Sequence, residues 1–288
     1  MTRLSQAELE LIPEILSFFN LGKPKQVTPI KLGIANHNYF VNAGQSEFVV
    51  KFLINQSLEA MENDVAIQQY LSNAGIDTPR YLSNDLGVKL FIQDHHRAVV
   101  STKIAGVVPD TIDTKLAEEF GRKLAQFHVS VKLLPYENSA GLMNPVVSGI
   151  ESTIFSQPLP KGVIHGDFHA GNALVDSTKQ ATIVAMLDFE EAGENIYIVD
   201  LALTVMGVCS KEDNVMDLGL IDGSIRGYES IRPLSAHEKA HFSAATQYAA
   251  NTWIQWFQAN GFYKYARNHR KRLNTFMAFE KHISFAEA

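Results

Sequence analysis

Roughly the first hundred residues alternate short apolar runs with turn residues, a pattern that is typical of β-strands. A helical period interrupts the strands at 56–75, where apolar side chains recur every three or four positions and Gly75 supplies a stop. We therefore expect an antiparallel sheet with one helix packed against it. The strand-like runs are QVTPIKLG, HNYFVNAG, EFVVKFLI, GVKLFIQD and RAVVSTKIAG, all between residues 26 and 106.

After Gly106 the pattern becomes mainly helical. A helix with one apolar stripe is predicted over 113–134, with Asp113 as its cap, and nearly every segment from about Asp200 onward has a helical period. Short strand candidates lie between these helices, in GVIHGD, NALVD and ATIVAMLDF. The sequence thus predicts an α+β protein with a β-rich lobe at residues 1–102 and a larger helical lobe at residues 103–288.

The N-terminal segment has the pattern of an amphipathic helix that begins after Ser5, with Glu8 completing a capping box. Charged residues and Pro13 interrupt its apolar positions, so it does not resemble a secretory signal. No apolar run approaches the length of a membrane span, and the lone Cys209 suits a reducing compartment. We expect a cytoplasmic protein that does not associate with a membrane.

Composition narrows the class of ligand. The 288 residues are 46% hydrophobic and 19% charged, which is enough for a sizeable core, and the net charge is −6. This charge argues against a nucleic-acid partner, because phosphate backbones require a broad basic surface. A small anionic ligand stays compatible with it, since one lysine and one metal ion hold such a ligand locally.

The stretch KGVIHGDFHAGNALVD, at residues 161–176, carries the densest set of chemical groups. An apolar lead-in is followed by Asp167 and, five residues later, by Asn172, and a second strand candidate ends at Asp188. Carboxylate and amide oxygens are hard ligands that suit Mg²⁺. A carboxylate that orients a hydroxyl, together with such a metal site, is what phosphoryl transfer needs.

The paired motifs HGDFHAGN and MLDFE resemble the catalytic loop and metal-binding segment of the aminoglycoside phosphotransferase and choline kinase family. The resemblance implies a two-lobed fold like that of protein kinases, with ATP as the phosphoryl donor and a small-molecule hydroxyl as the acceptor. It also implies that Asp167 is the catalytic base, that Asn172 and Asp188 hold Mg²⁺, and that His165 braces the loop.

In the same family a strand lysine pairs with the ATP phosphates, and Lys51 within EFVVKFLI matches that setting. An exposed strand lysine is the alternative interpretation. Three acidic residues of the following helix, Glu59, Glu62 and Asp64, are open as partners of Lys51.

The remaining nucleotide contacts are less sharply marked. The turn KLGIANHNYFV lacks the glycine-rich loop of protein kinases, so Asn36 and Asn38 are the candidates for phosphate contacts, and an ordinary hairpin turn is the alternative. By position, the backbone of Thr102, Lys103 and Ile104 matches the hinge that meets adenine in the family.

Two further residues match positions of the family without a predicted catalytic role. We interpret His128 as a packed or capping histidine and Asp200 as a residue that braces a loop. Glu190 stands where protein kinases have glycine after Asp-Phe, which disfavours a regulated signalling kinase.

The segment from 227 to 257 is similar to the corresponding part of homoserine kinases built on this fold, which implies L-homoserine as the acceptor. Arg232 then faces the acceptor carboxylate or serves as a surface helix-entry residue. Choline, an aminoglycoside or a sugar are alternative acceptors, because the fold does not fix the acceptor. For choline, Trp253 and Trp256 with Glu190 and Glu191 would form an aromatic and acidic cage.

Three other interpretations of the motif stay open. The polar stretch is a simple turn between core strands; or the chain is a silent ligand-binding module with a kinase fold; or His165, Asp167 and His169 bind zinc as in a metallohydrolase. The oligomeric state is open as well.

Overall fold

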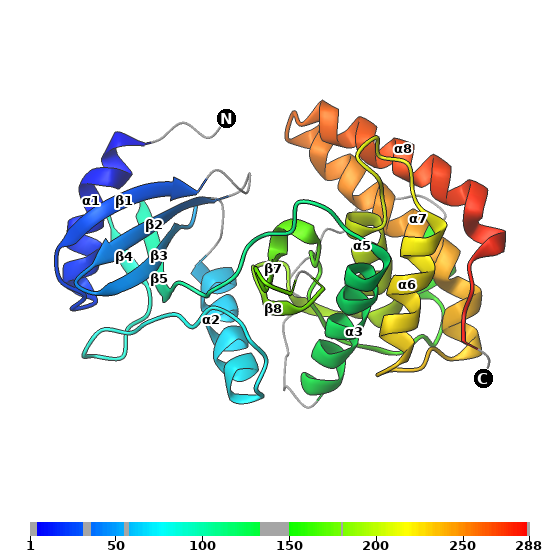
Figure 1. Ribbon diagram of the computed structural model, residues 1–288, viewed down its shortest axis with the longest axis horizontal. Coiled ribbons are helices and arrows are strands. Elements are labelled where there is room, and N and C mark those ends of the chain that lie inside the picture. The colour runs from blue at the N-terminus through cyan, green and yellow to red at the C-terminus, as the bar shows by residue number, and fades with distance from the viewer. Residues whose placement is uncertain (1–4, 31–35, 55–57, 133–149, 180, 287–288) are drawn as a thin grey trace. The chain divides into compact units, whose positions relative to one another are not determined.

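The computed structural model describes residues 5–30, 36–54, 58–132, 150–179 and 181–286. The chain divides into two compact units, Met1–Ala105 and Gly106–Ala288 (Figure 1). The first is built on an antiparallel sheet and the second is mainly helical, which confirms the α+β class. The boundary predicted after residue 102 lies three residues before the boundary between the units.

The first unit contains a five-stranded antiparallel sheet in the order β1-β2-β3-β5-β4. Lys51 lies on the central strand, opposite Asn38 of β2 and Val99 of β5. The strands are β1 (Pro24–Ile30), β2 (His37–Ala43), β3 (Ser46–Phe52), β4 (Phe91–Gln93) and β5 (His96–Thr102).

Two helices cover this sheet, where the sequence predicted one. Helix α1 (Gln6–Phe18) packs Ile12, Ile15 and Leu16 against the face that carries Val50. Helix α2 (Leu58–Asn73) packs Met61 against Val99 on the other face. Neighbouring strand residues point to opposite faces, so the two helices enclose the sheet.

The start of α1 follows the sequence prediction in part. Ser5 caps the helix by accepting a hydrogen bond from the Glu8 backbone N–H. The Glu8 carboxylate turns toward the sheet, where it accepts hydrogen bonds from His37 Nδ1 at 2.8 Å and Tyr39 OH at 2.7 Å. Glu8 is buried, and these bonds compensate its loss of hydration.

The second unit is built from helices around a buried central helix, α5. Asp113 caps α3 by accepting from the Leu116 N–H, as predicted. Among the described residues, no helix combines the length and the apolar character needed to cross a membrane. The helices are α3 (Thr114–Ser130), α4 (Ile150–Phe155), α5 (Tyr197–Val208), α6 (Leu218–Glu229), α7 (Ala236–Ala259), α8 (Tyr263–Phe279) and the 3₁₀ turns η1 (Ala170–Asn172) and η2 (Glu280–His282).

Two short antiparallel strand pairs frame the polar motifs. Strand β6 (Lys161–Ile164) pairs with β9 (Gly193–Ile196), and β7 (Ala173–Val175) pairs with β8 (Ile183–Met186). The sequence predicted β6, β7 and β8 but missed β9, which has a polar centre at Glu194 and Asn195. The motif residues occupy the connections after β6 and after β8.

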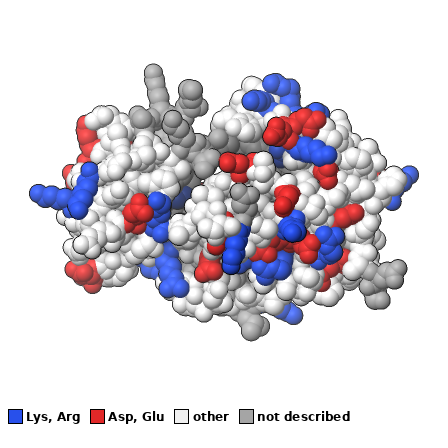
Figure 2. Space-filling view, in the orientation of Figure 1, with Lys and Arg blue, Asp and Glu red and all other residues white. Residues whose placement is uncertain are grey.

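Charge is distributed without a single dominant sign. Figure 2 shows Lys and Arg side chains interspersed with Asp and Glu over the visible face, in keeping with the net charge of −6.

Helices α3 and α6 approach each other so closely that glycine is required at the contact. A Cβ placed on Gly121 would lie 1.8 Å from the Ser224 carbonyl oxygen, and one on Gly227 would lie 1.8 Å from the Glu118 carbonyl oxygen. Both obstacles are backbone atoms of the facing helix, so a rotamer change does not relieve them. The two glycines therefore set the spacing of α3 and α6.

We predict that Gly227→Ala lowers the free energy of unfolding by about 3 kcal/mol, because the helices must separate to admit the methyl group. Gly219→Ala is the matched control, since Gly219 lies in the same helix, is exposed and meets only the Asp217 side chain. Its effect should stay within about 1 kcal/mol. Urea denaturation of both variants measures the difference, and equal effects would contradict the proposed packing.

Candidate active site

The loop after β6 brings Asp167 and Asn172 together. Asn172 Nδ2 donates to the Asp167 backbone carbonyl at 2.9 Å and to Asp167 Oδ2 at 3.0 Å. The Asp167 side chain is 31% exposed, so a substrate can reach it. The amide nitrogen is bonded to Asp167, and no donor within the described ranges bonds to Asn172 Oδ1, which leaves this atom for a ligand.

The β7–β8 hairpin places Asp188 next to this pair. The Leu187 N–H donates to the Asn172 carbonyl at 2.9 Å, which extends the hairpin by one residue pair toward the loop. Asp188 follows directly and has a left-handed backbone, with φ 64°. A non-glycine residue in this region costs free energy, and such residues concentrate at functional sites. The two metal ligands implied by the family resemblance thus lie on neighbouring chain segments.

Asp200, at the start of α5, fixes the backbone of the loop. Its carboxylate accepts hydrogen bonds from the His165 N–H at 2.7 Å and the Gly166 N–H at 2.8 Å. Gly166 has φ 81°, a conformation that favours glycine. Asp200 is fully buried, and the prediction that it braces a loop is confirmed.

His128 supports Asp200 from α3. Its Nε2 lies 2.8 Å from Asp200 Oδ2 and its Nδ1 lies 2.7 Å from the Tyr228 hydroxyl. Burial lowers the pKa of His128 in spite of the nearby Asp200 carboxylate. The ring is therefore neutral, with Nε2–H donating to Asp200 and Nδ1 accepting from Tyr228. His128 is a packed histidine, as predicted.

His165 ties the loop to the segment that carries Asp188. Its Nε2–H donates to the Leu187 carbonyl at 3.1 Å, and its Nδ1 accepts from the Asp167 N–H at 3.3 Å. Burial lowers the pKa of His165, which keeps the ring neutral and suits one donor and one acceptor. The bracing role implied by the family resemblance agrees with these bonds.

The zinc hypothesis does not fit this geometry. Both ring nitrogens of His165 are occupied by backbone groups, so the ring has no lone pair directed at a metal. The part of the chain that the structure describes contains no group of three or more His, Cys, Asp or Glu side chains arranged to hold a metal ion.

His169 places a titratable ring beside the Asp167 carboxylate. Its Nδ1 accepts from the Gly171 N–H at 3.0 Å, and its Nε2 lies 3.5 Å from Asp167 Oδ2. Burial lowers the pKa of His169, but the charges of Asp167 and Asp188 and the contact with Asp167 outweigh it, so the net shift is upward. Because the Gly171 N–H occupies Nδ1, the Asp167 carboxylate favours a proton on the facing Nε2 atom.

Glu191 adds a third carboxylate that the sequence interpretation considered only for a choline cage. Burial and the negative charges of Asp167 and Asp188 raise its pKa to about 7. Three carboxylates within electrostatic reach of one another favour a bound cation, because a cation relieves their repulsion.

In the first unit, Lys51 lies on the sheet face that α2 covers, since its cross-strand neighbour Val99 packs against that helix. Of its three candidate acidic partners, Glu59 and Glu62 are exposed and Asp64 is buried. Asp64 accepts hydrogen bonds from Gln68 Nε2 at 3.1 Å and Tyr81 OH at 2.7 Å. Burial favours Asp64 as the partner.

The other predicted nucleotide contacts also lie in the first unit. Asn36 is buried and its Oδ1 accepts from the Ile54 N–H at 3.2 Å, while Asn38 lies in β2 opposite Lys51. Thr102 ends β5, and the Lys103 N–H donates to the Glu47 carbonyl at 3.0 Å, with Ile104 following. Residues 31–35 of the predicted turn, including Gly33, lie outside the described residues.

Arg232 is neutralised by a contact within the protein. Its guanidinium lies 2.8 Å from Glu238 Oε1, donates to the Tyr228 hydroxyl at 3.3 Å and lies 4.7 Å from the Tyr197 ring centroid. These contacts favour the second of its two interpretations, a residue at the entry to α7, over contact with an acceptor carboxylate.

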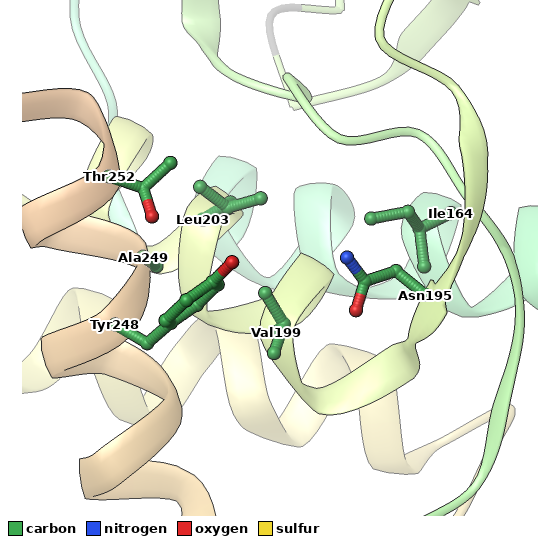
Figure 3. Close-up of a pocket in the computed structure, with 7 residues that line it drawn as sticks. All are labelled: Ile164, Asn195, Val199, Leu203, Tyr248, Ala249 and Thr252. Carbon is green, nitrogen blue, oxygen red and sulfur yellow. The ribbon is translucent and has the colours of Figure 1, made fainter. Parts of the chain in front are cut away.

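A small pocket lies beside the catalytic loop but does not include its carboxylate (Figure 3). Thr252 Oγ1, one of its polar atoms, is buried with no hydrogen-bond partner among the described residues. The pocket is lined by Ile164, Asn195, Val199, Leu203, Tyr248, Ala249 and Thr252.

This chain is similar in sequence and in structure to known small-molecule kinases. The homoserine kinase of Methylobacillus flagellatus is 24% identical over 273 residues, which cover 87% of this chain and 84% of that protein. Among solved structures, the amicoumacin kinase hAmiN in complex with AMP-PNP, Ca²⁺ and amicoumacin superposes with a TM-score of 0.71 at 16% identity, covering 94% and 96% of the two chains. A microcompartment-associated aminopropanol kinase superposes with a TM-score of 0.67 at 16% identity, covering 94% and 98%.

The structural neighbours confirm the predicted kinase-like fold. The sequence pattern of the phosphotransferase enzyme family matches residues 26–143 and 152–234, which is most of the chain and includes Lys51, Asp167, Asn172 and Asp188. The chain therefore belongs to the phosphotransferase enzyme family.

Proposed function

We propose that this protein is a Mg²⁺-dependent kinase that transfers the γ-phosphate of ATP to the side-chain hydroxyl of L-homoserine. The observation that carries the proposal is the constellation of Asp167, Asn172 and Asp188, which His165 joins and Asp200 fixes in place. Phosphoryl transfer depends mainly on such positioning and on charge neutralisation.

Asp167 is the proposed catalytic base. It is accessible, and Asn172 Nδ2 restricts its carboxylate to one orientation. The acceptor oxygen bonds to the γ-phosphorus while the bond from that phosphorus to the β-phosphate oxygen breaks, and the hydroxyl proton passes to Asp167. His169 is suited to limiting the negative charge around Asp167 before the acceptor arrives.

The residues present fit a magnesium ion. Asn172 Oδ1 and the Asp188 carboxylate are hard oxygen donors, and no donor among the described residues occupies that amide oxygen. The raised pKa of Glu191 is a second sign that the region lacks positive charge. When bound, Mg²⁺ would neutralise phosphate oxygens of the nucleotide.

For the nucleotide itself we propose Lys51 as the phosphate contact, with Asp64 as its partner and Asn36 and Asn38 in supporting positions. At the hinge, we propose that the backbone of Thr102, Lys103 and Ile104 contacts adenine. Because the Lys103 N–H already donates to the Glu47 carbonyl, the Lys103 carbonyl and the Ile104 N–H are the groups proposed to form hydrogen bonds with adenine.

L-Homoserine is the preferred acceptor because a homoserine kinase resembles this chain along most of both sequences. The structural neighbours act on chemically different alcohols, amicoumacin and aminopropanol, so the fold alone does not select the acceptor. Choline, aminoglycosides and sugars are the alternatives. A silent ligand-binding module is disfavoured by the intact set of Lys51, Asp167, Asn172 and Asp188.

The direct experiment is ADP release from ATP and Mg²⁺ in the presence of L-homoserine, choline, an aminoglycoside, a sugar and simple amino alcohols. Turnover with L-homoserine at the highest kcat/KM is expected. A clear preference for another alcohol would show that L-homoserine is not the acceptor. ATP binding without turnover of any tested alcohol would favour the silent ligand-binding module.

We predict that Asp167→Asn lowers kcat by about 10²–10⁴-fold and leaves the affinity for Mg²⁺–ATP nearly unchanged, because the variant loses the proton acceptor but no proposed phosphate contact. Asp167→Ala should behave in the same way. Steady-state kinetics and calorimetric titration with a non-hydrolysable ATP analogue measure the two quantities.

Asp176→Asn is the matched control, since Asp176 is a carboxylate of the same segment that lies in an exposed turn. Its kcat should equal that of the unmodified protein. Near-normal turnover in Asp167→Asn would remove Asp167 from the catalytic role.

The raised pKa of Glu191 predicts a pH-dependent effect on stability. Between its ordinary value near 4.5 and its value of about 7, the folded protein binds the proton more tightly than the unfolded chain, so stability falls as the pH rises through this window. In metal-free protein, Glu191→Gln should therefore raise the free energy of unfolding at pH 8 by about 1–3 kcal/mol and change it little at pH 4.5.

Urea denaturation in a chelator at the two pH values measures this difference, with Glu212→Gln as the exposed control. Added Mg²⁺ should reduce the gain at pH 8, because the cation neutralises the same cluster. A gain of equal size at both pH values would contradict the electrostatic account.

A further inference from the structure

Arg272, near the middle of α8, is a half-buried arginine whose hydrogen-bond partners among the described residues are all neutral. Its Nη1 donates to the Met206 carbonyl at 2.9 Å, and its Nε and Nη2 donate to Asn214 Oδ1 at 3.1 and 2.9 Å. Burial lowers the pKa of Arg272, although an arginine keeps its charge at neutral pH.

These bonds leave part of the guanidinium unused. A guanidinium has five N–H groups, and the three described bonds occupy Nε–H and one N–H on each terminal nitrogen. One N–H on each terminal nitrogen has no acceptor among the residues that the structure describes and is open to a ligand. Among the described residues no carboxylate lies within ion-pair distance of Arg272, in contrast to Arg232, which Glu238 neutralises.

The packing of α5 connects Arg272 to the loop that carries Asp167. Met206, whose carbonyl accepts from Arg272, precedes Gly207. A Cβ on Gly207 would lie 2.6 Å from His169 Cβ and 3.4 Å from the Trp253 ring, so His169 packs directly on this turn of α5. His169 in turn reaches Asp167 at 3.5 Å.

Arg272 lies within electrostatic reach of His169 and His269. Its guanidinium charge opposes protonation of both rings, although the net shift of the His169 pKa is upward. Arg272 is therefore close to the ring that contacts Asp167.

His269 adds an open polar group on the same face of α8, three residues before Arg272. It is 7% exposed, packs against Trp253 with ring centroids 4.8 Å apart, and its Nδ1 has no hydrogen-bond partner among the described residues. The region between α5, α7 and α8 thus combines an aromatic wall with unused hydrogen-bonding groups.

We propose that Arg272 is the receptor for the carboxylate of the acceptor, so that the substrate class is a short hydroxy or amino-hydroxy acid rather than a neutral or purely cationic alcohol. The inference rests on the proposed function and adds to it the group that selects the acid. A half-buried cation without a protein anion gains more from binding a carboxylate than an exposed one, because water screens the exposed charge. A planar guanidinium also holds a carboxylate through two parallel hydrogen bonds.

The test compares L-homoserine with 3-aminopropan-1-ol, which is the same amino alcohol without the carboxylate, and with L-homoserine amide, in which a neutral carboxamide replaces the carboxylate. In the unmodified protein, kcat/KM for L-homoserine should exceed that for either analogue by about 100-fold. In Arg272→Met this ratio should fall to nearly 1, mainly through a higher KM for L-homoserine, while the KM for ATP stays within about twofold. Arg272→Lys should keep an intermediate ratio, because it retains the charge and loses the fork.

Arg267→Met is the matched control, an exposed arginine on the same helix, and should preserve the full ratio. If Arg272→Met lowers kcat/KM by the same factor for L-homoserine and for its analogues, the proposal is overturned. This holds whether or not the variant yields less folded protein. An unmodified protein that phosphorylates 3-aminopropan-1-ol as well as L-homoserine would also overturn it, a result that needs no variant.

Calorimetric binding of L-homoserine and of 4-hydroxybutyrate separates this inference from the proposed function. If Arg272→Met weakens the binding of these acids by about 10-fold or more, the carboxylate site is supported. If the unmodified protein binds them but shows no turnover, the kinase activity is contradicted while the site stands. Binding of both acids that is unchanged in Arg272→Met would contradict the site whatever the activity.

Discussion

The buried carboxylate of Asp200 is the constraint on which the catalytic region depends. It accepts hydrogen bonds from the backbone N–H groups of His165 and Gly166 and from the ring of His128. These hydrogen bonds, rather than hydration, compensate its negative charge. Removing such partners leaves a buried charge unsatisfied, which costs several kcal/mol. The same bonds hold Gly166 in its left-handed turn and so direct Asp167 outward. Stability and catalytic geometry are therefore properties of one network.

The network also positions the residues to which we assign phosphoryl transfer. His165 bonds the loop to the Leu187 carbonyl, and the β7–β8 pairing sets Asn172 beside Asp188, so the proposed metal donors are arranged before a metal binds. Pre-arranged donors need no reorganisation during the reaction. The result is a concentration of negative charge around Asp167, Asp188 and Glu191, which a bound cation would neutralise.

Local patterns predicted the parts of the fold that local forces decide. The cap at Asp113, the stop at Gly75 and the strand that carries Lys51 follow from residue spacing. Strand β9 was missed because its centre is polar and its pairing with β6 is a tertiary contact. The burial of Glu191 and Arg272 depends on tertiary packing and cannot be predicted from the local sequence. Nothing in the residue pattern of α8 separates Arg272 from Arg267 and Arg270, which are exposed on the same helix. The two interpretations of Arg232 stayed open for the same reason, since its partner Glu238 is identified by packing.

The most direct measurement is a crystal structure of the protein with Mn²⁺ in place of Mg²⁺ and a non-hydrolysable ATP analogue, with the metal located by its anomalous scattering. The account predicts an anomalous peak at Asn172 Oδ1 and the Asp188 carboxylate, the γ-phosphate facing Asp167, and Lys51 at the inner phosphates. A metal bound elsewhere, or an Asp167 carboxylate directed away from the γ-phosphate, would contradict it.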